Sequence, residues 1–176
     1  RKRVAGPRPT RASCGLPETG FVFCSFNNSY KYTPEVFAVW LSLLQQVPES
    51  VLWLLADNPA AEKNLRKVAG AKGFAPERLV FATRVSPENY LARYLVADLF
   101  LDTFPFNAGT TANDCLWMGC PLVTYTGRSF GARMAGALLT AAGLSELITY
   151  NLADYEALAL ALARDPARCT DRKSVV

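Results

Sequence analysis

The stretch D-L-F-L-D-T-F-P-F-N-A-G-T-T-A-N-D-C-L-W, residues 98–117, decides the fold of this chain. Residues 99–103 form a short apolar run, which is typical of a buried parallel strand. Residues 104–109 contain proline, asparagine and glycine, so they predict a loop. Thr110 then stands where it can cap a helix that ends at Gly119. The stretch therefore predicts a strand, a tight loop and a helix N-terminus lined by hydroxyl groups.

A strand, a loop and a helix in this order form the usual binding place for an anion in an open α/β sheet. Unpaired amides and the helix dipole point towards the ligand at such a helix N-terminus. An ordinary βα turn with a threonine cap explains the same spacing, because threonine is a common residue at a helix start. The spacing alone leaves both interpretations open.

Strands and helices are expected to alternate six times along the chain. The expected strands are 21–26, 51–55, 78–82, 99–103, 121–125 and 147–149, and the expected helices are 34–47, 60–71, 86–97, 110–119, 130–142 and 152–164. This alternation predicts an α/β fold, a Rossmann-like parallel sheet with helices on both faces. The apolar spacing places Trp40 and Trp53 in the core. We expect the domain to span 21–165, between a basic linker at 1–20 and a tail at 166–176.

The composition limits the classes of partner. A chain of 176 residues, 51% of them hydrophobic, is one globular domain or one lobe of a larger protein. Basic residues gather in residues 1–11, before the first acidic residue at Glu18, and the remainder is close to neutral, so no nucleic-acid partner is expected. No apolar stretch has membrane-spanning length and no signal peptide is visible, so no membrane partner is expected.

The chain has five cysteines, no histidine and no Cys-x-x-Cys pair. The lack of histidine excludes a Ser-His or Cys-His catalytic pair in this chain. The same composition argues against a zinc site, so no metal is expected. An odd number of irregularly spaced cysteines suits reduced thiols, which predicts a cytoplasmic location.

The two common phosphate-binding motifs are absent. The first expected strand is followed by F-N-N-S-Y-K, residues 26–31, which lacks the glycines of G-x-G-x-x-G, and G-x-x-x-x-G-K-[ST] does not occur. Lys31 is the cation at the expected ligand edge of the sheet, where it can neutralise the charge of a departing phosphate. A solvated loop lysine is the competing interpretation.

Three further side chains can contact a nucleoside. Tyr90 and Arg93 lie one turn apart on an expected helix, so one can stack on a base while the other donates to its carbonyl groups. Asp114 lies one turn into the helix that starts at Thr110 and can accept hydrogen bonds from ribose hydroxyls. A surface pair and a favourable acidic residue near a helix start are the structural alternatives.

Three long motifs carry a family resemblance. They are C-G-L-P-E-T-G-F-V-F-C-S-F-N-N-S-Y-K (14–31), A-D-L-F-L-D-T-F-P-F-N-A-G-T-T-A-N-D-C-L-W-M-G-C-P-L-V-T (97–124) and G-R-S-F-G-A-R-M-A-G-A-L-L (127–139). They closely resemble the C-terminal catalytic lobe of the O-linked N-acetylglucosamine transferases, most strongly the bacterial relatives that carry tetratricopeptide repeats. Spindly-type enzymes belong to the same group. The resemblance covers residues 12–164 in unbroken order.

The resemblance implies a GT-B fold, in which this chain is the lobe that holds the donor UDP-N-acetylglucosamine (UDP-GlcNAc). It implies that Lys31 contacts the donor diphosphate, with Asn28 beside it. Thr110 and Thr111 are expected to hold phosphate oxygens at the helix N-terminus. Gly109 stands where the animal enzymes have a histidine before the threonine pair, so one side-chain contact to the donor is lost.

The nucleoside end of the donor is assigned in the same way. The resemblance implies that the backbone around Val85 faces the uracil, that Arg93 contacts the base and that Tyr90 occupies a stacking position. It implies that Asp114 holds the ribose. Pro87 departs from the family pattern, because the animal enzymes have a ribose-contacting lysine there.

The resemblance thus implies an inverting, metal-independent glycosyltransferase that uses no cofactor beyond its donor and moves N-acetylglucosamine to Ser or Thr of acceptor proteins. The N-terminal catalytic lobe and the tetratricopeptide repeats are absent from these 176 residues. A general base is not evident in the chain and is expected from the other lobe, the substrate or water. Two alternatives stay open: another donor such as GDP-fucose, and a non-catalytic nucleotide-binding or scaffold module.

Overall fold

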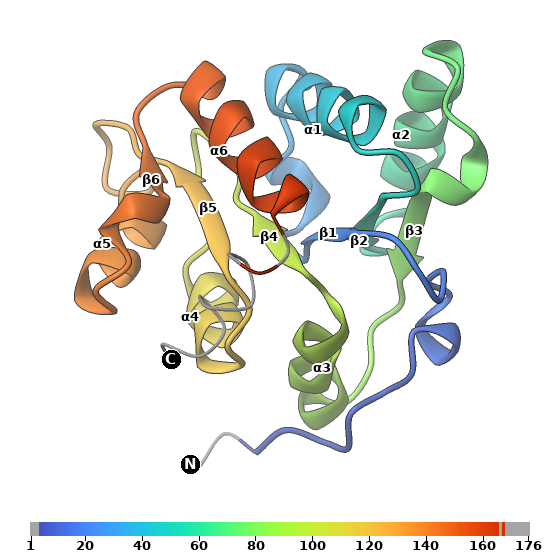
Figure 1. The fold of residues 1–176 in the computed structure, drawn as a ribbon, viewed down its shortest axis with the longest axis horizontal. Helices are drawn as coiled ribbons and strands as arrows, with labels where there is room; N and C mark the ends of the chain where they lie inside the picture. Colours follow the sequence, from blue (N-terminus) through green and yellow to red (C-terminus); the bar gives the residue numbers. More distant parts are fainter. Residues whose placement is uncertain (1–3, 166, 168–176) are drawn as a thin grey trace.

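The computed structural model describes residues 4–165 and 167, and its centre is a parallel sheet of six strands (Figure 1). The order of the strands across the sheet is β3-β2-β1-β4-β5-β6. The strands are Val22–Ser25 (β1), Val51–Leu55 (β2), Leu79–Ala82 (β3), Leu99–Leu101 (β4), Leu122–Tyr125 (β5) and Ile148–Thr149 (β6). All the paired strands run parallel, so the predicted parallel sheet is confirmed.

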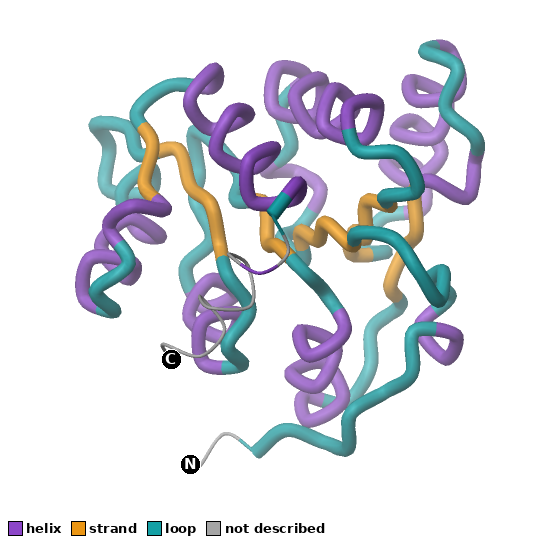
Figure 2. Tube along the Cα trace, in the orientation of Figure 1, coloured by secondary structure: helices purple, strands orange, loops and turns teal. Residues whose placement is uncertain are grey.

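Helices cover both faces of the sheet. They are Pro34–Gln46 (α1), Pro59–Ala71 (α2), Pro87–Arg93 (α3), Thr110–Trp117 (α4), Met134–Ala141 (α5) and Leu152–Arg164 (α6). Helices α1, α2 and α6 lie on one face, and α3, α4 and α5 lie on the other (Figures 1 and 2). The chain builds outward from β1 to β3, crosses back to β4 beside β1, and builds outward again to β6. Loops at the carboxyl ends of β1 and β4 therefore meet at a switch point, which is where such sheets bind ligands.

Local sequence signals explain where two of the helices begin. The Thr33 hydroxyl accepts a hydrogen bond from the backbone N–H of Val36, and the Ser86 hydroxyl accepts one from the N–H of Asn89. A proline follows each cap residue, at a position where its missing N–H costs nothing. Both helix starts were predicted from this pattern and are confirmed.

One predicted helix begins later than its sequence suggests. The apolar pattern predicted a helix from residue 130, but α5 begins at Met134. Residues 129–133 instead form tight turns, in which the N–H of Ala132 donates to the carbonyl of Ser129 and the N–H of Arg133 donates to that of Phe130. These turns leave Phe130 exposed beside the carboxyl end of β5.

The two tryptophans predicted for the core are buried there. Trp40 on α1 is 0% exposed and Trp53 on β2 is 1% exposed. The Trp40 indole Nε1 donates to the Tyr155 hydroxyl at 3.0 Å, which joins α1 to α6. The core prediction is therefore confirmed, with a polar link inside it.

The stretch expected to be a linker contacts the domain. The Arg11 guanidinium lies 2.8 Å from the Asp98 carboxylate, and the side chain of Leu16 is buried in the core. The N–H of Gly6 donates to the carbonyl of Glu88. Residues 4–20 thus run along the domain, and the boundary at residue 20 stays a prediction. The predicted tail at 166–176 lies outside the described residues except for Ala167.

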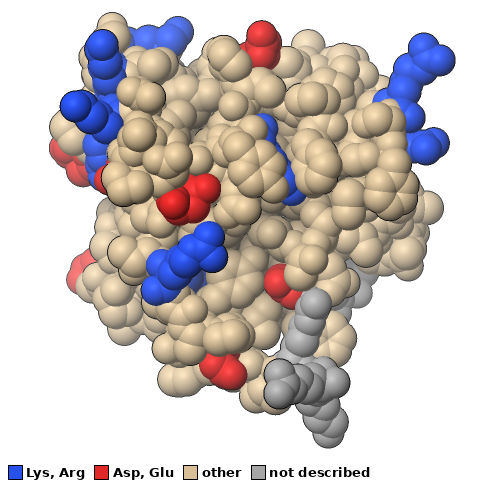
Figure 3. Space-filling view, turned by 180° about the vertical axis from the view of Figure 1, so that it is seen from behind, with Lys and Arg blue, Asp and Glu red and all other residues tan. Residues whose placement is uncertain are grey.

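The distribution of surface charge and the length of the helices are relevant to two classes of partner, nucleic acids and membranes. On the face shown in Figure 3, basic side chains lie in separate groups with acidic side chains between them. Within the described residues, every helix falls short of the length or the apolar character that crossing a membrane requires.

Replacing Gly20 by alanine is expected to destabilise the fold by at least about 1 kcal/mol, the usual cost of a left-handed conformation for other residues. Gly20 has a φ of +92°, and a Cβ atom there would overlap the carbonyl oxygen of Glu49. Gly70 is the matched control, because it lies inside α2 with open space around it. Gly70→Ala should stabilise the helix. Urea denaturation measures both, and equal midpoints for the two variants would contradict the steric argument.

Candidate functional site

A cleft of about 380 Å³ lies at the carboxyl end of the sheet, between α3 and α4. Its lining residues come from the ends of β1 and β2, the loop after β3, and the two helices. They are Phe26, Leu55, Arg84, Val85, Pro87, Tyr90, Arg93, Thr110, Thr111 and Asp114. Six of the nine residues predicted to bind the ligand therefore share one cavity.

The N-terminus of α4 forms one wall of this cleft, and it lacks a side-chain cap. The prediction that Thr110 caps the helix is wrong, because Gly109 occupies the cap position and Thr110 is the first helical residue. No described side chain accepts a hydrogen bond at this cap. The first amides of a helix have no partner within the helix, so this end is suited to an anion.

Tyr90 forms part of the opposite wall, on α3. Its hydroxyl lies 2.7 Å from the hydroxyl of Tyr94, which in turn donates to the carbonyl of Thr111 on α4. Its ring contacts Phe26 edge-on, with 6.2 Å between the ring centroids. Burial raises the pKa of Tyr90 to about 12, so the phenol stays neutral at physiological pH. The stacking role predicted for this ring stays a prediction.

Arg93 and Asp114 supply charge on the two sides of the cleft. The Arg93 guanidinium lies 6.0 Å from the ring centroid of Trp53, and burial lowers its pKa while leaving it a cation. The Asp114 side chain is buried on α4. The cleft thus offers a fixed donor on one side and a carboxylate acceptor on the other.

Lys31 lies apart from the cleft, on the loop after β1. Its Nζ donates to the backbone carbonyl of Asn107 at 3.1 Å and lies 4.2 Å from the ring centroid of Phe106. Burial lowers its pKa, and the charge of Asp102 acts in the opposite direction. Asn28 precedes the short turn Ser29–Lys31 and does not line the cleft either. Lys31 is therefore tied to the loop that leads into α4.

Asp102 is the residue that sequence reasoning missed. It lies at the end of β4, is 1% exposed, and accepts hydrogen bonds from the N–H groups of Thr103 and Ala108 and from the Thr124 hydroxyl. Burial raises its pKa to about 7, and these hydrogen bonds and Lys31 oppose that rise. A lone carboxylate at the end of an otherwise apolar strand was the signal that could have identified it.

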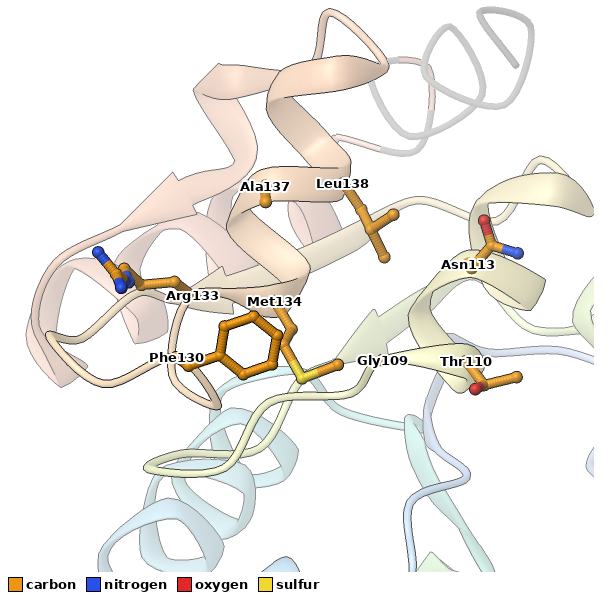
Figure 4. A pocket seen from close by; sticks show the side chains of 8 residues that line it. All are labelled: Gly109, Thr110, Asn113, Phe130, Arg133, Met134, Ala137 and Leu138. Atoms are coloured by element: carbon orange, nitrogen blue, oxygen red, sulfur yellow. The ribbon is translucent and has the colours of Figure 1, made fainter.

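A second and larger cavity, of about 740 Å³, adjoins the other side of α4. Its lining residues are Gly109, Thr110, Asn113, Phe130, Arg133, Met134, Ala137 and Leu138. Figure 4 shows the Met134 thioether reaching from α5 towards Gly109. A Cβ atom at Gly109 would overlap the Met134 Cε, the far end of a flexible side chain.

Thr110 lines both cavities, so the N-terminus of α4 separates them. Among residues 4–165 and 167, no group of three or more His, Cys, Asp or Glu side chains is placed to hold a metal ion.

Comparisons with known proteins give sequence matches over nearly the whole chain. Residues 7–176 match the model of glycosyl transferase family 41. The chain is 38% identical over 157 residues to the probable UDP-N-acetylglucosamine–peptide N-acetylglucosaminyltransferase SEC of Arabidopsis thaliana, which covers 89% of this chain and 16% of that protein. It is 35% identical over 167 residues to the UDP-N-acetylglucosamine–peptide N-acetylglucosaminyltransferase of Caenorhabditis elegans, covering 95% of this chain and 14% of that protein.

A solved structure supports the same relationship. A mutant O-GlcNAc transferase from Thermobaculum terrenum superposes with a TM-score of 0.84 at 33% identity, covering 89% of this chain and 31% of that one. The chain thus spans a minor part of each of these relatives. The predicted resemblance and the predicted GT-B-type lobe are both confirmed. The sequence match, the identity to these transferases and the shared fold together place the chain in glycosyl transferase family 41.

Proposed function

We propose that this chain is the donor-binding lobe of an inverting protein O-glycosyltransferase that moves N-acetylglucosamine from UDP-GlcNAc to Ser or Thr of proteins. One observation carries the proposal: six predicted donor-binding residues line a single cleft at an uncapped helix N-terminus. The names of the related transferases supply the donor and the peptide acceptor.

In this proposal the cleft binds the nucleoside. Arg93 donates to the base and Asp114 accepts from the ribose hydroxyls, since both residues line the cavity, one on α3 and the other on α4. Tyr90 contacts the base with its ring, because its hydroxyl is already bonded to Tyr94. The backbone at Val85 borders the same space.

The diphosphate lies at the N-terminus of α4 in this proposal. There the amides of the first turn and the hydroxyls of Thr110 and Thr111 donate to the phosphate oxygens. Lys31 approaches from the loop after β1, beside Asn28, and its ammonium contacts the leaving diphosphate. The reaction uses no cofactor besides the donor.

The transfer step is a single displacement. The acceptor hydroxyl attacks the anomeric carbon on the face opposite the diphosphate, and the bond from that carbon to the phosphate oxygen breaks with its electron pair going to UDP. Lys31 and the α4 N-terminus stabilise the negative charge that develops there. The hydroxyl proton goes to a base supplied by the other catalytic lobe, by the substrate or by water.

The remaining partners lie outside this chain. The other catalytic lobe closes the donor cleft and, with tetratricopeptide repeats, presents the acceptor protein. A reducing compartment such as the cytoplasm suits a protein with unbridged thiols such as those of Cys14 and Cys115.

A transfer assay on the full-length protein tests this proposal. The protein is incubated with acceptor proteins and either UDP-GlcNAc or GDP-fucose, each with a labelled sugar. We expect label on Ser or Thr from UDP-GlcNAc alone. Label from GDP-fucose alone would assign the other donor, and no label from either would favour a non-catalytic module, so both outcomes would overturn the proposal.

Gly109→His is expected to keep the affinity for UDP, and Gly109→Val is expected to weaken it strongly. Either side chain displaces the Met134 methyl group. Valine, which branches at Cβ, also holds its two methyl groups beside the diphosphate, because its χ1 rotation is restricted. Calorimetric titration of UDP into the full-length variants measures the difference. The double variant Gly109→Val, Met134→Ala serves as a control, because it removes the overlap with Met134 and leaves the crowding at the diphosphate. Equal UDP affinities for the Gly109→His and Gly109→Val variants would contradict the placing of the diphosphate at the N-terminus of α4.

A further inference from the structure

Asp102 closes the loop that connects β4 to α4. One carboxylate oxygen, Oδ1, accepts from the N–H of Thr103 at 2.8 Å and from the N–H of Ala108 at 2.7 Å. These two donors stand at opposite ends of the loop, so one oxygen fixes the separation of its ends. The other oxygen, Oδ2, accepts from the Thr124 hydroxyl on β5 at 2.6 Å.

The closed loop presents two groups to Lys31. The Thr103 hydroxyl donates to the carbonyl of Phe106 at 2.7 Å, and the Asn107 amide donates to the carbonyl of Thr103 at 2.8 Å. These bonds hold the Asn107 carbonyl and the Phe106 ring where both contact the Lys31 ammonium. The position of Lys31 therefore depends on a loop whose shape Asp102 sets.

The charge of Asp102 acts on Lys31 as well. Burial lowers the pKa of Lys31, and Asp102 is the group that raises it. The other titratable groups that face Asp102 are Tyr155 on α6, whose hydroxyl donates to the Asp102 carbonyl, and Cys115 on α4. Burial raises the pKa of both, so both are neutral at pH 7.

We propose that Asp102 is a positioning residue for the transfer reaction: its carboxylate closes the loop between β4 and α4, and this loop and the Asp102 charge together hold the Lys31 ammonium beside the leaving diphosphate. The catalytic meaning of this inference rests on the proposed function. The hydrogen bonds from the loop to Asp102, and the contacts of the loop with Lys31, do not depend on that function.

The variant Asp102→Asn removes the negative charge of the side chain and keeps its size and shape, so it tests the charge alone. The Asn side-chain oxygen can still accept from Thr103 and Ala108, and its NH₂ group can donate to the Thr124 hydroxyl, so the loop keeps its hydrogen bonds. Asp98→Asn is the matched control. Asp98 directly precedes β4, so it lies at the end of the strand opposite to Asp102. There its carboxylate accepts from the N–H of Val22 and pairs with Arg11.

The first readout is the pH dependence of Lys31 labelling by an amine-specific reagent, followed by mass spectrometry of the full-length protein. Loss of the Asp102 charge should move the labelling midpoint of Lys31 to lower pH by about 1 unit, and Asp98→Asn should leave it in place. An unchanged midpoint in Asp102→Asn would overturn the inference, whether or not the protein transfers sugar.

The second readout is the kinetics of transfer. In Asp102→Asn, kcat should fall about tenfold with little change in the donor KM, a smaller loss than removal of Lys31 itself. The loss should grow from pH 7 to pH 9, because the Lys31 ammonium deprotonates at lower pH without its neighbour. A rise in KM alone would contradict a role in the transfer step. Absence of transfer in the unmodified protein would defeat the proposed function, and the labelling result would still decide the inference.

Discussion

Replacing Lys31 by alanine is expected to abolish transfer by the full-length protein and to leave its fold intact. Lys31 Nζ is held by the Asn107 carbonyl and the Phe106 ring on the loop that leads into α4. In the proposed reaction its charge is needed most when the diphosphate departs, because the negative charge on the leaving group is then greatest. The loss should therefore appear mainly in kcat, by about 100-fold or more, and less in the donor KM.

Steady-state kinetics and thermal unfolding of the same preparation check this result. Lys67→Ala is the control, because Lys67 is an exposed lysine on α2, on the opposite face of the sheet from α4. It should match the unmodified protein in both measurements. Near-normal kcat in Lys31→Ala would remove Lys31 from the reaction and return it to an ordinary loop lysine.

Replacing Trp40 by alanine is expected to destabilise the domain by about 3–5 kcal/mol, the usual cost of truncating a buried aromatic residue. The side chain is fully buried on α1, and its indole N–H donates to the hydroxyl of Tyr155 on α6. Its ring also contacts Tyr32, with 5.2 Å between centroids. Truncation removes this packing and one of the links between α1 and α6.

Denaturant unfolding of the full-length protein measures the effect, with Trp117→Ala as the control. Trp117 lies at the end of α4 and is 62% exposed, so its loss should change stability little. A Trp40→Ala protein with an unchanged unfolding midpoint but weakened UDP binding would contradict the core assignment.

The fold follows from patterns that a single sequence displays. Strands β2 and β4 are short, wholly apolar runs, and β1 is apolar except for Ser25, because buried parallel strands need no polar alternation. Cap-then-proline pairs at Thr33 and Ser86 fixed two helix starts. The start of α5 could not be predicted, because the turns at 129–133 are held by backbone hydrogen bonds that apolar spacing does not reveal.

The site was predictable where its residues follow strand ends or share a helix face. Tyr90, Arg93 and Asp114 line one cleft because α3 and α4 flank the switch point of the sheet. Two features of the site could not be predicted from the sequence, because they depend on the three-dimensional structure. Helix α4 starts at Thr110, one residue earlier than a Thr110 cap would require, so its cap position falls at Gly109. Asp102 acquires its role from Thr124 and Lys31, which are distant from it in the sequence.

Calorimetric titration of UDP into the full-length protein tests the central claim, that the cleft beside the α4 N-terminus binds the donor nucleotide. The variants are Thr110→Ala with Thr111→Ala, Asp114→Ala and Asp114→Asn. Because Thr110 does not cap α4, the double threonine change should weaken UDP binding by far more than it lowers stability. Asp114→Asn should bind UDP more tightly than Asp114→Ala, because Asn keeps an acceptor for a ribose hydroxyl. Equal UDP affinities across the unmodified protein and all three variants would contradict the account.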